Sequence, residues 1–169
     1  MKNFKLNEKD ILSNQDWTFP TTTYYGPGRF NEIGKFCEEF DIKNPLIVTD
    51  SGSKDLPFIK KLIALLSKNN IKSDLFYNIS PNPRDDEISK GCDQFKNGSH
   101  DSIIAIGGGS AMDGGKSICL TVNSETPLWD FEFEQPVPKI TKENAFPKII
   151  TIPTTAGTGA ETEITAMVT

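Results

Sequence analysis

The residues that could do chemistry gather in one glycine-rich stretch, IIAIGGGSAMDGGKS, at positions 103–117. Three consecutive glycines, Gly107, Gly108 and Gly109, directly follow an apolar run, so they allow a sharp turn and bring bare amides close to a ligand. A strand, a glycine turn and a helix together present N–H groups and the positive end of a helix dipole. The stretch therefore predicts a phosphate site, with Ser110 as helix cap and additional hydroxyl donor.

Two common phosphate-binding motifs do not fit this stretch. A P-loop needs glycine at the position of Ser110 to pair with the GKS that follows. The dinucleotide fingerprint GxGxxG matches Gly107 and Gly109 but has Met112 in its third place, and the loop follows the third predicted strand of a series instead of the first. A glycine turn that only packs tightly is an alternative that the sequence leaves open.

Alternating strand and helix patterns predict the frame that holds this loop. Short apolar runs rich in β-branched residues alternate with segments whose apolar residues recur at helical spacing. Apolar strands without a polar face indicate an α/β fold in which a parallel sheet is flanked by helices. The predicted series is a strand or hairpin at 17–26, helix 29–40, strand 45–50, helix 56–69, strand 74–79, a helix carrying Ile88 and Phe95, strand 101–106 and helix 111–122.

Polar or glycine-rich segments follow the predicted strands. They are Asp50, PNP at 81–83, GGGS at 107–110 and PTTAGTG at 153–159. Ligands of parallel sheets bind outside the carboxyl ends of the strands, so we expect these four segments to share one edge and to form the binding cleft there.

Composition excludes some classes of function. The chain has 169 residues, enough for one domain, and its 18 basic and 23 acidic residues give a net charge of −5, which argues against a nucleic-acid-binding surface. No run approaches the length of a membrane span, and the polar start at 1–15 is unlike a signal peptide, so we expect a cytoplasmic protein. The three cysteines lack CxxC spacing and are expected to be small buried hydrophobes.

Four motifs, LIVTDSG, PNP, DSIIAIGGGSAMDGGKS and IPTTAGTGAETE, occur in this order, each after or within a predicted strand. With them the chain resembles the iron-containing, or group III, alcohol dehydrogenase family from about residue 24 to its last residue. The resemblance implies a Rossmann-like nucleotide-binding domain of the type shared with dehydroquinate synthases. We expect residues 1–169 to form this domain, with a polar extension at 1–15.

The resemblance also names cofactor-binding residues. Asp50 would accept hydrogen bonds from the adenosine ribose, and Asn82 would line the adenine side. The glycine loop would hold the diphosphate, and three threonines would bracket the cofactor further along. The residues of the glycine loop are Gly107, Gly108, Gly109 and Ser110, and the three threonines are Thr154, Thr155 and Thr158.

Three charged residues have two interpretations each. A carboxylate at a strand end accepts from both ribose hydroxyls and repels a 2′-phosphate, so Asp50 favours NAD over NADP. Asp before Ser-Gly also forms Asx turns, and that alternative stays open. Asp113 and Lys116 lie one turn into the helix after the glycines, and Lys116 could complement phosphate charge, but a solvated or capping role stays open for both.

The metal of the family raises a separate question, because hydride transfer there uses a divalent ion that polarises the alcohol oxygen. The single histidine, His100, lies in the turn sequence NGSHDS and is expected at the surface instead of on a metal. In the family the metal ligands follow the segment that matches GTGAETEITAMVT. We therefore expect Fe2+ or Zn2+ only in a longer protein, with the helical metal domain missing here, and no catalysis by this chain alone.

The resemblance implies a nicotinamide dinucleotide as partner and, in the full-length protein, a small primary or secondary alcohol or aldehyde as substrate. Such a protein could form a homo-oligomer. Two alternatives remain: a stand-alone dinucleotide-binding module without catalysis, and a zinc-dependent relative acting on glycerol or glycerol phosphate. The apolar end EITAMVT, at 163–169, predicts one further strand that another part of the protein would cover.

Overall fold

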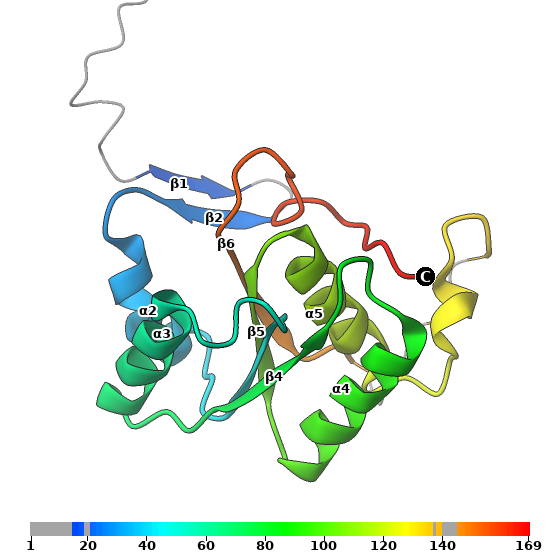
Figure 1. Ribbon diagram of the computed structural model, residues 1–169, viewed down its shortest axis with the longest axis horizontal. Coiled ribbons are helices and arrows are strands. Elements are labelled where there is room, and N and C mark those ends of the chain that lie inside the picture. The colour runs from blue at the N-terminus through cyan, green and yellow to red at the C-terminus, as the bar shows by residue number, and fades with distance from the viewer. Residues whose placement is uncertain (1–14, 19–20, 137, 140–144) are drawn as a thin grey trace, which may run out of the picture.

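The computed structural model describes residues 15–18, 21–136, 138–139 and 145–169, and its centre is a four-stranded sheet with helices on both faces (Figure 1). The strands lie in the order β4-β3-β5-β6, and every neighbouring pair is parallel. The predicted α/β fold is therefore confirmed. The sheet strands are β3 (Pro45–Asp50), β4 (Asp74–Ile79), β5 (Ser102–Gly107) and β6 (Lys148–Pro153).

The helices follow the strands in the predicted alternation, and an antiparallel hairpin precedes them. The pattern expected at 29–40 divides into a 3-10 turn and a short α-helix. Residues 1–14 of the predicted polar extension lie outside the described residues. The remaining elements are β1 (Gln15–Thr18), β2 (Thr22–Tyr25), η1 (Arg29–Glu32), α2 (Ile33–Glu39), α3 (Pro57–Lys68), α4 (Asp85–Asn97), α5 (Gly109–Thr121) and η2 (Leu128–Phe131).

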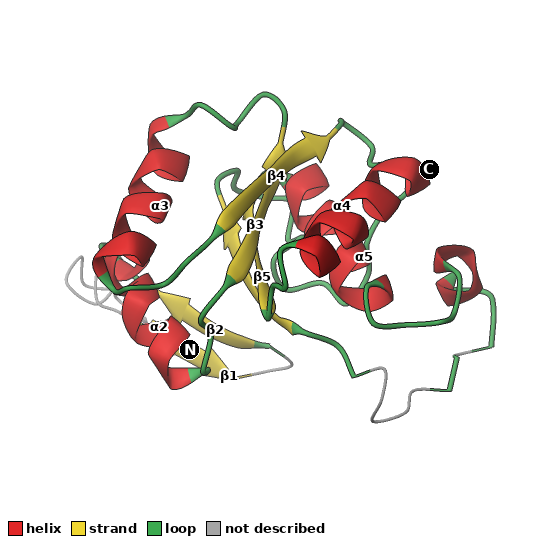
Figure 2. Ribbon diagram, turned by 90° about the horizontal axis from the view of Figure 1, so that it is seen from below, coloured by secondary structure: helices red, strands yellow, loops and turns green. Residues whose placement is uncertain are grey.

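Strands β3 and β5 are buried on both faces, which explains why they are continuous apolar runs. Successive side chains point to opposite faces of a strand, so Val48 and Ala105 join the core under α4 and α5. Ile47 and Ile104 join the second core under α2 and α3. Figure 2 shows the two helical layers on opposite sides of the sheet.

The chain adds β4 on one side of β3 and then adds β5 and β6 on the other side. From β3 the chain passes through α3 to β4 on one side, and then α4 carries it back to β5 on the other side of β3. The carboxyl ends of β3 and β5 therefore flank a topological switch point, where the loops leave the sheet in opposite directions. Asp50 ends β3 and Gly107 ends β5.

Helix α5 packs against the sheet through two glycines on its inner face, where no side chain would fit. A Cβ atom at Gly115 would lie 2.5 Å from the Cβ of Ala105, and one at Gly114 would lie 2.7 Å from the Cδ1 of Ile79. The GG pair of the DGGKS stretch is therefore a packing feature, which the sequence analysis missed. The spacing of residues could have indicated this role, because both glycines lie on the same helical stripe as Ala111 and Ile118.

His100 is 7% exposed, so the prediction of a surface position for it is wrong. Its Nδ1 atom lies 3.0 Å from the carbonyl oxygen of Asn44, and its Nε2 atom lies 3.4 Å from Oδ2 of Asp74. The ring also lies against Phe95, with 5.9 Å between the ring centroids. The turn after α4 thus folds its histidine under the amino-terminal edge of the sheet, where a hydrophilic sequence context gave no sign of burial.

The predicted burial of the cysteines is confirmed for Cys37 and Cys119 and is wrong for Cys92, which is only half-buried. Burial raises the pKa of the Cys119 thiol to about 12. The pKa of the Cys37 thiol is raised to about 11, mainly by burial and to a smaller extent by the negative charge of Asp101. Both thiols are therefore held in the protonated form that suits apolar packing.

We predict that Gly115→Ala destabilises the chain although alanine favours helices. The added methyl group would have to push α5 away from β5, at a cost of about 1–3 kcal/mol, against a helix-propensity gain of about 1 kcal/mol. Urea denaturation of both proteins measures the difference. Gly109→Ala is the matched control, because a Cβ there meets only Cγ2 of Thr158 at 4.0 Å. Equal denaturation midpoints for the wild type and Gly115→Ala would contradict the packing role.

Candidate functional site

The glycine loop turns the chain from β5 into α5, and two of its glycines have different functions. Gly107 has a φ of +149°, and a Cβ there would lie 2.7 Å from the Cβ of Ala111. Gly108 has an ordinary φ of −80°, and a Cβ there would meet only Oγ1 of Thr155, at 3.5 Å. Gly107 is therefore required by the fold, whereas nothing in the fold requires glycine at 108.

Ser110 does not cap the helix as predicted. The N-cap residue is Gly108, helix α5 begins at Gly109, and no side chain makes a capping hydrogen bond there. Ser110 is therefore the second residue of the helix, because the chain turns earlier than the Ser-cap preference suggested. The first N–H groups of a 13-residue helix are left for another acceptor.

The threonine-rich loop after β6 lies beside the glycine loop. The amide of Thr154 donates to the carbonyl oxygen of Gly107 at 2.8 Å, next to the strand pairing of Pro153 with Gly107. Oγ1 of Thr155 lies near the Cβ position of Gly108, and Cγ2 of Thr158 lies near that of Gly109, at the distances given above. All three threonines are exposed. The structure thus brings the two predicted loops together. The hydroxyl of Thr155 lies toward Gly108, and that of Thr158 accepts a hydrogen bond from the Ala160 amide.

Asp50 lies at the end of β3 and faces the same loop. Its Oδ2 atom is 3.2 Å from the position that a Cβ of Gly107 would take. The carboxylate also accepts hydrogen bonds from the Ser53 amide, at 3.0 Å, and from the Ser53 hydroxyl, at 2.7 Å. Both donors belong to Ser53, three positions on, and not to Gly52, whose amide an Asx turn through DSG would use. These two bonds hold the carboxylate at the switch point.

Asn82 lies in the loop after β4, is exposed, and has a φ of +57°. The end of β4 is tied to the end of β3, because the Ser51 amide donates to the carbonyl oxygen of Ile79 at 3.2 Å. The loop that carries Asn82 therefore leaves the sheet beside the Asp50 turn, as the parallel arrangement predicted.

Glu87 organises this loop, and the sequence analysis did not identify it. Its Oε2 atom accepts hydrogen bonds from the amide and hydroxyl of Ser80 and from the amide of Arg84. Burial acts to raise the pKa of Glu87, but these hydrogen bonds and the positive charge of Arg84 hold it below its ordinary value of 4.5. Glu at the third position of a helix, as in a capping box, was the available signal.

Lys116 and Asp113 contact the C-terminal segment. Nζ of Lys116 donates to the carbonyl oxygens of Glu163 and Thr165, at 2.7 and 3.0 Å. Burial lowers the pKa of Lys116. The pKa of Asp113 is raised, chiefly by burial, although a hydrogen bond from the amide of Met167 opposes the shift. Both side chains are half-buried and bond to the backbone of a distant segment, so the solvated or capping role left open for them does not describe these contacts. A phosphate role for Lys116 stays a prediction.

The prediction of a strand at 163–169 is wrong, because this segment carries no strand in the structure. Its backbone groups bond to side chains of α5 and to the loop after β4 instead of to a neighbouring strand. The amide of Thr169 donates to the carbonyl oxygen of Pro83 at 2.8 Å, and the amide of Asp85 donates to the carbonyl oxygen of Thr169. The segment therefore connects α5 with the loop that carries Asn82.

The sequence profile of the family described as iron-containing alcohol dehydrogenase matches residues 20–169. The chain belongs to this family. It is 30% identical over 148 residues to 1,3-propanediol dehydrogenase of Klebsiella pneumoniae, which covers 86% of the chain and 37% of that relative. It is 32% identical over 166 residues to choline dehydrogenase of Bacillus subtilis (strain 168), covering 97% of the chain and 41% of that relative.

The fold also agrees with that of a crystal structure. Sulfoacetaldehyde reductase from Bifidobacterium kashiwanohense, in complex with NAD+, superposes with a TM-score of 0.69 at 28% identity. The match covers 80% of this chain and 35% of that one. The chain thus spans well under half the length of the relatives it matches, and the motifs that carried the resemblance all lie in the matched part.

The described part of the chain holds no group of three or more His, Cys, Asp or Glu side chains placed to bind a metal ion. Its residues therefore do not fit the metal of the iron-containing alcohol dehydrogenases, and we assign no metal ligand and no metal-dependent step to them.

None of the helices in the described ranges is long and apolar enough to cross a membrane.

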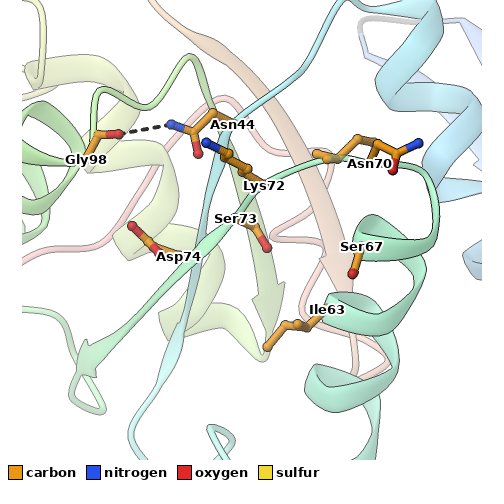
Figure 3. Close-up of a pocket in the computed structure, with 9 residues that line it drawn as sticks. Asn44, Ile63, Ser67, Asn70, Lys72, Ser73, Asp74 and Gly98 are labelled. Atoms are coloured by element: carbon orange, nitrogen blue, oxygen red, sulfur yellow. Dashed lines mark hydrogen bonds between the residues drawn. The ribbon is translucent and has the colours of Figure 1, made fainter.

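A hollow of about 670 Å³ opens at the opposite, amino-terminal edge of the sheet (Figure 3). Its walls come from the ends of α3 and α4 and the start of β4. Across one side, Nδ2 of the Asn44 side chain donates to the carbonyl oxygen of Gly98. The predicted cofactor residues do not contribute to it. The lining residues are Asn44, Ile63, Ser67, Asn70, Ile71, Lys72, Ser73, Asp74 and Gly98.

We predict that Glu87→Gln lowers the free energy of unfolding by about 1–2 kcal/mol at neutral pH, because charge-assisted hydrogen bonds become neutral ones. A carboxyl whose pKa is lowered by folding stabilises the fold above its unfolded pKa, and this contribution is lost as the pH falls through the lowered value. The difference between the two proteins should therefore shrink below pH 4.5. Urea denaturation from neutral to acidic pH measures it.

Asp93→Asn is the control for this series, because Asp93 is an exposed acid on the same helix. Its unfolding free energy should follow that of the wild type across the pH range. A pH-independent difference between Glu87→Gln and the wild type would contradict the assigned charge effect.

Proposed function

We propose that this chain binds a nicotinamide dinucleotide at the carboxyl ends of β3 and β5, with NAD preferred to NADP. The observation that carries this proposal is the backbone at Gly108, which is extended, needs no glycine for the fold, and lies at the amino end of α5 beside an exposed hydroxyl. The amides of Gly108, Gly109 and Ser110 would hold the diphosphate there, supported by the dipole of α5.

The remaining predicted residues extend this site in both directions. Asp50 would accept hydrogen bonds from the hydroxyls of the adenosine ribose, and Asn82 would line the adenine side. A carboxylate at this place disfavours the 2′-phosphate of NADP, because two negative charges would then face each other. Thr154, Thr155 and Thr158 would contact the cofactor on the other side of the glycine loop.

For the whole protein we propose metal-dependent hydride transfer between a small primary or secondary alcohol and its carbonyl form. Bound nicotinamide supplies the chemistry, because it accepts or releases the hydride. The role of this chain is to hold and orient the dinucleotide. The named relatives at 30 and 32% identity are a propanediol and a choline dehydrogenase, so the proposal stops at this substrate class.

We predict that Gly108→Val weakens NADH binding at least about tenfold, or about 1.4 kcal/mol, and leaves the fold intact. The valine side chain would cover the amides that approach the diphosphate, whereas the backbone φ of −80° suits any residue. Titration of NADH fluorescence measures binding, and urea denaturation measures stability. Unchanged NADH affinity in the folded variant would refute the diphosphate site.

Gly107→Val is the contrasting variant. It should destabilise the fold itself, because its φ of +149° is unfavourable for valine and its Cβ would meet Ala111. We expect Gly108→Val to lose NADH binding and keep its stability, and Gly107→Val to lose stability. This difference would separate the ligand-binding role of Gly108 from the structural role of Gly107.

We predict that Asp50→Gly narrows the preference for NADH over NADPH by on the order of tenfold, since the repulsion of the 2′-phosphate is removed. Parallel fluorescence titrations with the two nucleotides give the ratio of dissociation constants. Asp55→Gly is the control, because it removes an equal charge from an exposed position in the same connection. A ratio in Asp50→Gly equal to that of the control would limit Asp50 to its role in the turn.

A further inference from the structure

We propose that Ser53 is a positioning residue that fixes the Asp50 carboxylate and thereby contributes to the choice of NAD over NADP. This inference rests on the proposed dinucleotide site. Ser53 lies in the turn between β3 and α3 and is half-buried. Its hydroxyl donates to Oδ2 of Asp50 at 2.7 Å, and its amide donates to Oδ1 at 3.0 Å. Each carboxylate oxygen is therefore held by a different donor.

Two donors in a fixed turn define the direction of the carboxylate before any ligand arrives. The Ser53 amide also donates to the carbonyl oxygen of Asp50 at 3.1 Å, so the backbone of the turn is closed independently of the side chains. Oδ2 is the oxygen that lies toward the glycine loop, near the Cβ position of Gly107. A carboxylate held in place loses less conformational freedom on binding than a mobile one, which strengthens binding of the matching ligand.

The direction of the Ser53 proton gives this pair its selectivity. A hydroxyl has one hydrogen, and because Ser53 donates it to Asp50, its oxygen offers only lone pairs to a ligand. Ribose hydroxyls can donate to both groups. A 2′-phosphate brings only acceptor oxygens and negative charge, so neither Asp50 nor Ser53 offers it a hydrogen bond.

The effect of Ser53 on nucleotide preference should therefore depend on Asp50. When the carboxylate is removed, the Ser53 hydroxyl is free to rotate and can donate to a phosphate oxygen. Ser53 should then favour NADPH instead of opposing it. Such a reversal is a coupling between two contacting residues, which a double-mutant cycle isolates.

The test compares the wild type, Ser53→Ala, Asp50→Ala and the double variant, each titrated with NADH and with NADPH by fluorescence. We expect Ser53→Ala to weaken NADH binding roughly three- to tenfold and NADPH binding less, so that the preference for NADH narrows. In the Asp50→Ala background the same change should weaken NADPH binding instead. Ser53→Thr keeps the hydroxyl and should restore the wild-type preference.

Ser51→Ala is the matched control, because Ser51 is an exposed serine of the same turn that uses its amide to bond Ile79. It should bind both nucleotides like the wild type. Urea denaturation of every variant checks that a change in nucleotide preference does not follow from a loss of fold.

The outcomes separate the two levels of the proposal. A wild-type chain that is folded and binds neither nucleotide overturns the dinucleotide site itself. Normal NADH binding by the wild type, together with an unchanged NADH to NADPH ratio in Ser53→Ala, overturns the positioning role and leaves the site standing. Strictly additive effects in the double-mutant cycle also overturn it.

Discussion

The close contact between α5 and β5 is the constraint on which the site depends. Because Gly115 lets the helix approach Ala105, the chain has to turn from β5 into α5 over only two residues, Gly107 and Gly108. No side chain caps the start of this helix, so its first amides have no side-chain acceptor.

Burial of the sheet on both faces brings the loops to one edge. Apolar strands covered by two helical layers have to run parallel here, since each strand is joined to the next through a helix. All four carboxyl ends therefore meet at one edge, and the reversal of strand order separates the loops after β3 and β5. The place of the proposed dinucleotide site follows from this topology before any individual side chain is considered.

Charged groups at this edge are used mainly to hold loops in place. Glu87 fixes the loop after β4, Lys116 and Asp113 fix the C-terminal segment, and Ser53 fixes the carboxylate of Asp50. Each contact satisfies a polar group that would otherwise be costly to leave half-buried. Gly108, Gly109 and Ser110 are half-buried, and the threonines at 154, 155 and 158 are exposed. Their N–H and hydroxyl groups are donors of the kind that suits an anion.

The amino-acid sequence by itself determined the order and type of the elements, the parallel sheet and the loops at its carboxyl edge, because strand and helix periodicity and turn residues act within a few positions. It also carried the family motifs that the profile match confirms. Only the tertiary structure decided that His100 is buried, that Ser110 is not a cap, that residues 163–169 form no strand, and that Lys116 bonds to carbonyl oxygens 47 and 49 positions away. These outcomes depend on which distant groups the packed sheet and helices bring together, and no local pattern contains that information.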